Sequence, residues 1–348
     1  MARWRRWLLL GGGGLLSVLV GAAATTRTGR YIARAAWEEG GILARRRPIA
    51  EVIADPRTDA RTRGMLGLVQ AVRRYAVDSI GLSAGRAYTT YSTLPGDTLV
   101  LVLTGARRDR LIRVTWWYPI IGSVPYQGFF RPADAEAARA ELEGLGLDAE
   151  LRPASAFSTL GWLDDPLLSP TLAGDSASVA ETVIHELLHT TYFVPGAVSM
   201  NESFANMVGH RGAQRFFRSR GDSANARLVG DRWNDEIRLG AFWSWYAMRL
   251  DSAFRAHDRD SLARLAARDT LETQARTVLR DSMGTWLRSP RPAGWADRAP
   301  LGNNAVLSKT LYRTGLITLD AAVQANRGDL RKAIRQIIEV DTRARKGP

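Results

Sequence analysis

The segment Val183-Ile184-His185-Glu186-Leu187-Leu188-His189 combines apolar side chains at helical spacing with two histidines four residues apart. The apolar positions predict a buried helix, which should end before Pro195-Gly196. Residues at i and i+4 lie one turn above each other, so both imidazoles can reach one ion. Glu186 lies one step round the helix and can contact a water on that ion without binding the ion itself. The pattern indicates a metal site, and the alternative is a pair of hydrogen-bonded core histidines.

A catalytic metal ion of this kind needs a third protein ligand and an open position for water. Position 195, where a longer form of the pattern would hold a third histidine, is proline. The segment Asn201-Glu202-Ser203-Phe204-Ala205 offers Glu202 in its place. A second helix that starts near Asn201 can pack antiparallel to the first and direct this carboxylate at the ion.

Other residues on these two helices have competing interpretations. Ser178-x-x-Glu181 and Ser199-x-x-Glu202 both match the capping box found at helix starts, so Glu202 has an alternative role as a cap. Asn206 lies one turn beyond Glu202, where its side-chain oxygen can accept an N–H from a ligand histidine, although plain helix surface fits equally. His210 lies two turns along, too far to bind the ion, and is expected to pack or to lie at the surface.

The charge of the chain is strongly basic, with 48 Lys and Arg against 35 Asp and Glu and a net charge of +13. Only three of the basic residues are lysines, and the arginines are scattered through every segment, often beside acids. A nucleic-acid-binding protein would gather them on one face, so we expect no nucleic-acid partner. The chain has no cysteine, which excludes disulfides and leaves His, Asp and Glu as metal ligands.

The N-terminal segment 1–24 resembles a targeting sequence. Arg3, Arg5 and Arg6 precede a long apolar run that ends in Ala22-Ala23-Ala24. This order of charged, apolar and small residues is typical of a signal peptide, and the run is also long enough to remain as a membrane anchor. We expect an exported protein, periplasmic or otherwise extracytoplasmic, that contacts the membrane through this segment. A non-exported helix is the alternative.

The remaining residues 25–348 predict a single α+β domain, mainly helical with a small mixed or antiparallel sheet. Helical spacing covers 29–85, strands alternate through 86–160, and helices fill 172–348, apart from a loop rich in Pro, Gly and Asn at 289–304. A helix at 134–145, ended by Gly146, interrupts the strands. The expected strands are 87–91, 98–103, 111–118, 125–130 and 149–156.

The chain resembles a family of bacterial zinc aminopeptidases of the Glu-ligated, or gluzincin, type. The resemblance extends from about Tyr31 to Tyr312 and implies a zinc peptidase with one Zn²⁺ per chain, in which His185, His189 and Glu202 bind the ion and Glu186 is the general base. Many relatives carry a cysteine for lipid attachment after the signal segment, and this chain has none. The stretches that carry the resemblance are Arg47–Ile49, Trp117–Phe130, Ser158–Pro166, Val183–His189, Asn201–Ala205 and Asn303–Ala305.

Peptide hydrolysis also needs groups that bind substrate and stabilise the developing oxyanion. Tyr312 is the first candidate for the oxyanion donor and Tyr126 the second, although tyrosines in such places often only pack. Tyr126, near an expected edge strand, and Asn304, in a matching stretch, are candidate substrate contacts. Asp165, or Asp164 beside it, can hold a substrate ammonium group, and a simple Asp-Asp-Pro turn is the alternative.

Three classes of function fit the sequence. A zinc-dependent hydrolase of peptides, most simply an aminopeptidase, uses every feature of the motif. A zinc-binding but inactive scaffold does not need Glu186, and a membrane-surface partner-binding protein does not need the histidines. Metal content separates the last class from the other two, and peptide hydrolysis separates the first two.

Overall fold

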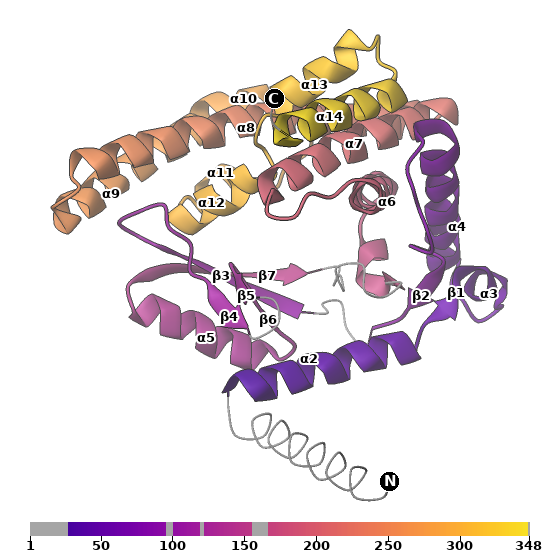
Figure 1. Cartoon of the computed structure of the whole chain (residues 1–348), viewed down its shortest axis with the longest axis horizontal. Helices are drawn as coiled ribbons and strands as arrows, with labels where there is room; N and C mark the ends of the chain where they lie inside the picture. Colours follow the sequence, from indigo (N-terminus) through magenta and orange to yellow (C-terminus); the bar gives the residue numbers. More distant parts are fainter. Residues whose placement is uncertain (1–26, 95–99, 119–121, 155–165, 347–348) are drawn as a thin grey trace, which may run out of the picture.

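The computed structural model describes residues 27–94, 100–118, 122–154 and 166–346. Helices make up most of it, and three small β-sheets complete it, so the predicted mainly helical α+β fold is confirmed (Figure 1). The predicted targeting segment lies outside the described residues. Among the residues inside those ranges, no helix has both the length and the apolar character needed to cross a bilayer.

The first part of the chain is helical, as the periodicity over 29–85 predicts. It contains α2 (Arg27–Ala44), α3 (Ile49–Ala54) and α4 (Ala60–Tyr75), the last continued by a π-helical turn, η1 (Ala76–Ile80). Asp59 caps α4 by accepting a hydrogen bond from the backbone N–H of Thr62, at 2.9 Å. The apolar face of α4 is fully buried and packs mainly against α6 (Ser176–Thr191).

The strands form three separate sheets, where the sequence predicted one. The strand bounds are β1 (Arg47–Pro48), β2 (Thr90–Ser92), β3 (Val100–Arg107), β4 (Trp116–Tyr118), β5 (Gly122–Val124), β6 (Gln127–Phe129), β7 (Leu147–Ala154) and β8 (Leu167–Leu168). The largest sheet is antiparallel in the order β6-β3-β7, while β4-β5 is a hairpin and β1-β2-β8 is mixed. The prediction missed β1, β5 and β8, because strands of two or three residues have no readable periodicity.

The helix predicted at 134–145 is α5 (Pro132–Gly144), which packs against β3 and β7. Gly146 follows it with a positive φ of 73°, a conformation that glycine adopts without strain, and β7 begins at the next residue. The start and end residues of the predicted strands shift by a few residues, but 98–103, 111–118, 125–130 and 149–156 each contain part of an observed strand.

Almost all of the chain after residue 168 is helical, as predicted. The first elements are a 3₁₀ turn, η2 (Ser169–Ala173), then α6, α7 (Val198–Ser219), α8 (Ser223–Ala256) and α9 (Ser261–Thr277). The later ones are a π-helical turn, η3 (Val278–Met283), α10 (Gly284–Trp286), α11 (Trp295–Arg298), α12 (Asn303–Leu311), α13 (Leu316–Ala325) and α14 (Leu330–Lys346). The loop predicted at 289–304 is therefore interrupted by α11 and ends at the start of α12.

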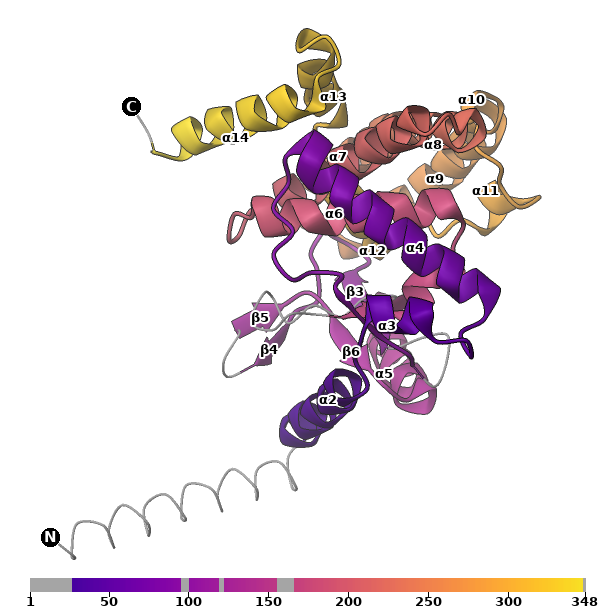
Figure 2. The ribbon, with the colours of Figure 1, turned by 90° about the vertical axis from the view of Figure 1, so that its right-hand side faces the viewer.

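The helices α6, α7 and α8 pack on one another and connect to the sheet through α12. In Figure 1, α12 lies between α8 and the strands β3 and β7, and contacts of α12 with all three agree with this view. Figure 2 shows α4 running across α6, while α14 extends away from the body with the C-terminus at its end. The main core is built around the buried faces of α4, α6 and α7.

Two glycines on α7 allow α6 to approach it closely. A Cβ atom at Gly209 would lie 2.8 Å from the carbonyl oxygen of Glu181 and 3.3 Å from Cβ of His185, and one at Gly212 would lie 2.9 Å from Cγ2 of Ile184. Separations under 3 Å are essentially closed to real side chains. The close contact of the two helices at the level of His185 therefore depends on glycine.

Candidate metal centre

Two columns of polar side chains face each other across the contact between α6 and α7. Every fourth residue of α6 contributes to one column, namely Glu181, His185 and His189, and every fourth residue of α7 to the other, namely Glu202, Asn206 and His210. The helices run antiparallel, so Glu202 meets the two histidines at one end and His210 meets Glu181 at the other. The helical period of the sequence is the reason that these residues are aligned.

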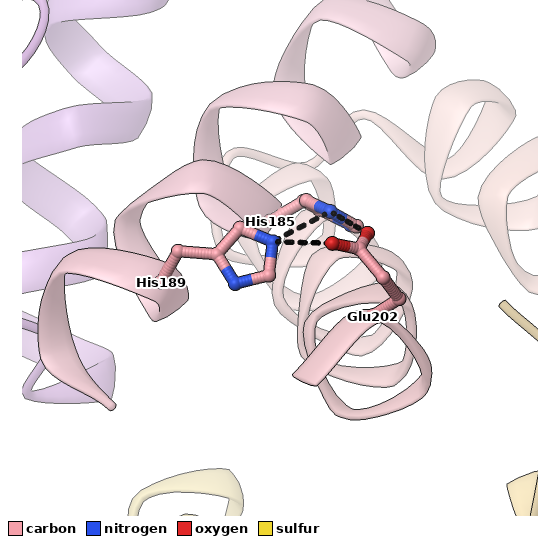
Figure 3. Close-up of side chains that lie close together, drawn as sticks. All are labelled: His185, His189 and Glu202. Atoms are coloured by element: carbon pink, nitrogen blue, oxygen red, sulfur yellow. Dashed lines mark hydrogen bonds and ion pairs between the residues drawn. The ribbon is translucent and has the colours of Figure 1, made fainter. Parts of the chain in front are cut away.

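Three of these side chains converge on a single point, and they are the three that the sequence predicted. Figure 3 shows His185 and His189 directed from α6 toward Glu202 on α7. The Nε2 atoms of the two histidines are 3.2 Å apart. The carboxylate oxygens of Glu202 lie 3.4 Å from Nε2 of His185 and 3.6 Å from Nε2 of His189.

These separations match the spacing of ligand atoms around a small metal ion. Bonds of about 2.0–2.1 Å in a tetrahedral arrangement place neighbouring ligand atoms about 3.3–3.4 Å apart. The three observed distances lie within a few tenths of an ångström of that value. The His185, His189 and Glu202 group, with all of its donor atoms within 4.8 Å of one another, can therefore hold a metal ion.

His189 is in the protonation state that metal binding requires. The pKa of His189 is lowered to about 4, chiefly by burial and also by the nearby His185, while Glu202 opposes the shift. The ring is therefore neutral near pH 7, with a lone pair free on one nitrogen. Its Nδ1 atom is buried and has no hydrogen-bond partner within the described residues. In a neutral ring with Nε2 on an ion, Nδ1 would carry the hydrogen.

The capping box predicted at Ser178 is wrong, and the alternative role of Glu202 in a capping box with Ser199 is not formed either. Asp175 precedes α6 and accepts the backbone N–H of Ser178 at 2.8 Å, so Ser178 is not the cap and Glu181 is free to face α7. The second helix starts at Val198, three residues earlier than predicted, and no side chain caps it. Ser199 therefore lies inside the helix, and the carboxylate of Glu202 is directed at the histidines.

Glu186 and Tyr312 complete the immediate surroundings of the cluster. Glu186 follows His185 on α6 and is half-buried. Tyr312 immediately follows α12 and is 39 % exposed. Partial burial raises the pKa of Tyr312, and the negative charges of Glu202 and Glu186 raise it further, which places its phenol within electrostatic range of both carboxylates. The phenol therefore keeps its proton at neutral pH and can donate a hydrogen bond.

The other predicted site residues occupy different positions. Tyr126 is 48 % exposed and lies immediately before β6. The negative charge that its phenol carries when ionised also raises the pKa of Tyr312. Asn304 is buried and donates to Oγ1 of Thr104 at 3.0 Å, so it fastens α12 to the sheet. Its predicted contact with substrate stays a prediction. Asp165 and its neighbour Asp164 lie outside the described residues.

Asn206 lies in the middle of its column, and His210 lies at the end away from the metal cluster. The amide of Asn206 donates to the carbonyl oxygen of Tyr312 at 3.2 Å and to Glu236 at 3.4 Å, so it links α7 to the end of α12. Its predicted hydrogen bond with a ligand histidine stays a prediction. His210 packs on the ring of Trp233, with 5.5 Å between centroids, in agreement with a packing role.

A cleft of about 770 Å³ extends from Tyr312 along this polar surface. The sequence analysis missed it because its walls come from β7, α6, α7, α8 and α12, which no single stretch of sequence brings together. One local signal was available, since Glu181 lies one turn before His185 on the same helical face. The ionisable side chains that line the cleft are Arg152, Asp175, Glu181, His210, Arg232, Glu236, Arg291, Lys309, Tyr312 and Arg313.

Comparison with known proteins agrees with this site. The chain matches the family described as "Putative aminopeptidase" over residues 30–346, which includes every described helix that contributes to the metal cluster and the cleft. None of the curated proteins matches it, and no solved structure does. Since the family match covers nearly the whole chain, the chain belongs to the "Putative aminopeptidase" family.

Proposed function

We propose that the chain is a zinc-dependent peptidase of the gluzincin type that removes residues from the amino terminus of peptides. The observation that carries this proposal is the convergence of His185, His189 and Glu202 on one point, with Glu186 beside them. Two imidazoles and one carboxylate are a donor set that suits zinc, and three protein ligands leave a position open. Membership of the family supports the aminopeptidase activity.

Zinc, when bound, supplies Lewis-acid chemistry that lowers the pKa of water and polarises a carbonyl group. The side chains of this chain carry out the proton transfers. Glu186 accepts a proton from the attacking water and delivers it to the amine that leaves. Tyr312, protonated at neutral pH, donates a hydrogen bond to the substrate carbonyl oxygen as negative charge develops there. Tyr126 and Asn304 remain candidate substrate contacts, and Asp165 a candidate for binding the ammonium group.

The test is the substitution Glu186→Gln in the full chain. The amide keeps the size of the side chain but cannot accept the proton, so peptide hydrolysis should fall by about 10²–10⁴. Zinc content should stay near one per chain, because Glu186 is not a proposed ligand. Glu339→Gln, at an exposed position of α14, is the matched control and should change neither quantity.

Three results would contradict this assignment in different ways. Full hydrolysis by the zinc-loaded Glu186→Gln protein would place the base elsewhere. Loss of zinc together with activity would make Glu186 a ligand. Zinc binding without hydrolysis of any peptide by the unsubstituted chain would favour the inactive scaffold.

We also propose that the protein acts outside the cytoplasm and contacts the membrane through residues 1–24. The arginines at positions 3, 5 and 6, the apolar run and the Ala22-Ala23-Ala24 stretch support this. Cell fractionation followed by N-terminal sequencing tests it. Recovery of soluble cytoplasmic protein that begins at Met1 would contradict it.

A further inference from the structure

The cleft beside Tyr312 contains more positive than negative charge. Five cationic side chains line it, and three acidic ones. All three acids lie at ion-pair distance from an arginine of the cleft. The pairs are Arg232 with Asp175 at 2.6 Å, Arg232 with Glu181 at 3.5 Å, and Arg313 with Glu236 at 2.8 Å. A third arginine, Arg291, pairs with the buried Asp235 at 3.4 Å.

Arg152 and Lys309 are the two cations that remain. Within the part of the chain that the structure describes, neither has a carboxylate at ion-pair distance, and Nε of Arg152 is buried without a hydrogen-bond partner. Both side chains are half-buried. Burial lowers the pKa of Lys309, and the charges of Arg313 and Arg152 lower it as well, while the charges of Glu150 and Glu236 oppose the shift. Two like charges are thus held near each other and partly removed from water, which is unfavourable unless an anion joins them.

The packing of α12 on β7 places this pair in the same cleft as Tyr312. Alternate residues of β7 point to one side of the sheet, and on the side facing α12 they are Asp148, Glu150 and Arg152. Asp148 and Glu150 receive hydrogen bonds from Asn303 and Asn304, at the start of α12. Arg152 lies further along the strand and lines the cleft together with Lys309 and Tyr312, near the other end of that helix.

Tyr312 lines the cleft with the cationic pair and is also within electrostatic range of Glu202 in the metal cluster. The charge of Arg152 lowers the pKa of Tyr312, while Glu202 and Glu186 raise it, so the phenol is within electrostatic range of both groups. Lys309 lies three residues before Tyr312, about one helical turn away. An anion bound by Arg152 and Lys309 would therefore lie in the part of the cleft that Tyr312 lines.

We propose that Arg152 and Lys309 form a subsite that binds a carboxylate of the peptide substrate. The proposal rests on the proposed peptidase function and specifies its substrate class. A guanidinium and an ammonium both form charge-assisted hydrogen bonds with carboxylates, and the acids in the walls of the cleft lie at ion-pair distance from Arg232 and Arg313. The carboxylate belongs either to an Asp or Glu side chain or to the C-terminus of a short peptide.

Equilibrium binding of matched fluorescent peptides to the zinc-loaded full chain tests the subsite. The Glu186→Gln protein is used so that the peptides are not cleaved. One pair compares Leu-Glu-amide with Leu-Gln-amide, and the other compares Leu-Gly as the free acid with its amide. We expect the acidic member of one pair to bind at least about tenfold more tightly, as one charge-assisted contact allows. The pair that shows the preference identifies the source of the carboxylate.

The double substitution Arg152→Gln and Lys309→Gln should reduce this preference to near unity. The charge-conserving pair Arg152→Lys and Lys309→Arg should retain most of it, which separates loss of charge from loss of structure. Arg218→Gln with Lys332→Gln removes the same charge at residues that do not line the cleft and should keep the preference. Thermal unfolding of each variant checks that it is folded.

The outcomes distinguish the subsite from the proposed function. Equal binding of both members of each pair, or a preference that survives the Gln double substitution, would overturn the subsite. A preference for acidic peptides that the double substitution abolishes supports it, even if the unsubstituted chain hydrolyses no peptide. Absence of hydrolysis in that case would overturn the peptidase proposal and leave an anionic-peptide binding site.

Discussion

Gly209 on α7 lies directly against the backbone of Glu181 on α6, so that a Cβ atom at position 209 would stand 2.8 Å from the carbonyl oxygen of Glu181. The same Cβ would lie 3.3 Å from Cβ of His185. The carbonyl oxygen belongs to helical backbone and cannot rotate away as the end of a long side chain can. The distance between the two helices, and with it the spacing of the three metal ligands, is therefore set by the absence of a side chain at this position.

We predict that Gly209→Ala destabilises the protein by about 1–3 kcal/mol and weakens zinc binding, because α7 must move away from His185. Urea unfolding and a competition assay with a zinc chelator measure the two effects. Gly64→Ala on α4 is the matched control, since nothing lies within 4 Å of a Cβ there, and it should be neutral or stabilising. Unchanged stability and zinc affinity in Gly209→Ala would show that the helix contact is loose.

Glu202→Ala should lower zinc affinity at least about a hundredfold, because loss of a direct ligand costs more than loss of a residue that only orients one. The carboxylate lies within 3.6 Å of both histidine nitrogens and does not cap a helix, so its removal should change the fold little. Metal analysis of the purified protein measures the effect, with Glu339→Ala as the control on an exposed helix. Zinc content equal to that of the unsubstituted chain would remove Glu202 from the ligand set.

Tyr312→Phe should lower kcat by about 10²–10³ with zinc content unchanged, which is the usual effect of removing one oxyanion donor. Tyr126→Phe is the comparison, because Tyr126 was the second candidate from the sequence. The charges of Glu202 and Glu186 raise the pKa of Tyr312 and are not among the causes of the shift at Tyr126. We therefore expect Tyr312→Phe to lower kcat more than Tyr126→Phe does. Steady-state kinetics on one peptide decides between them, and a larger loss in Tyr126→Phe would reverse the assignment.

Asp109 predicts a specific dependence of stability on pH. Hydrogen bonds from Arg107 at 2.9 Å and from Arg264 at 2.8 Å lower the pKa of this buried carboxyl to about 2. In the unfolded chain its pKa is near 4, so its contribution is complete above that pH and is lost as the pH falls toward 2. Asp109→Asn should therefore cost about 2–3 kcal/mol at pH 7 and much less near pH 2.5.

Denaturant unfolding of the Asp109→Asn protein at the two pH values measures this difference. Asp258→Asn serves as the control, because Asp258 also pairs with an arginine, Arg110 at 2.8 Å, but its side chain is 65 % exposed. Exposed pairs contribute little, so that variant should differ little from the unsubstituted chain at either pH. A stability gap for Asp109→Asn that is the same at both pH values would contradict the ionic origin of the effect.

The candidate metal ligands could be predicted from the sequence because the helical repeat of 3.6 residues determines which side chains share a face. His185 and His189 follow from helical spacing alone, and Glu202 follows from a helix that must return along the first after a short turn. The helix caps could not be predicted as well, since Asp175 and Ser178 are both good caps and only the observed backbone decides between them. The fold class was predictable for the same local reason, as periods of 3.6 and 2 can be read from the sequence.

Features that depend on contacts between distant segments could not be predicted. The strand β8 exists only because Tyr91 and Leu167 pair, and neither short segment has a pattern of its own. Arg152 and Lys309 look like ordinary surface cations in the sequence. Only the packing of α12 on β7 brings them to one cleft and leaves them without acidic partners among the described residues.

The three metal ligands come from neighbouring helices joined by a short loop, whereas Tyr312 and Arg152 come from segments far away in the chain. Closing a short loop has a small entropic cost, so the ligands can meet while the strands and α12 are still undocked. We therefore expect folding intermediates, and truncated molecules that retain only the hairpin formed by α6 and α7, still to bind the ion. Under the proposed function, the metal content of a preparation would therefore report on the α6–α7 hairpin alone, and the fraction of molecules able to hydrolyse peptides would have to be measured separately.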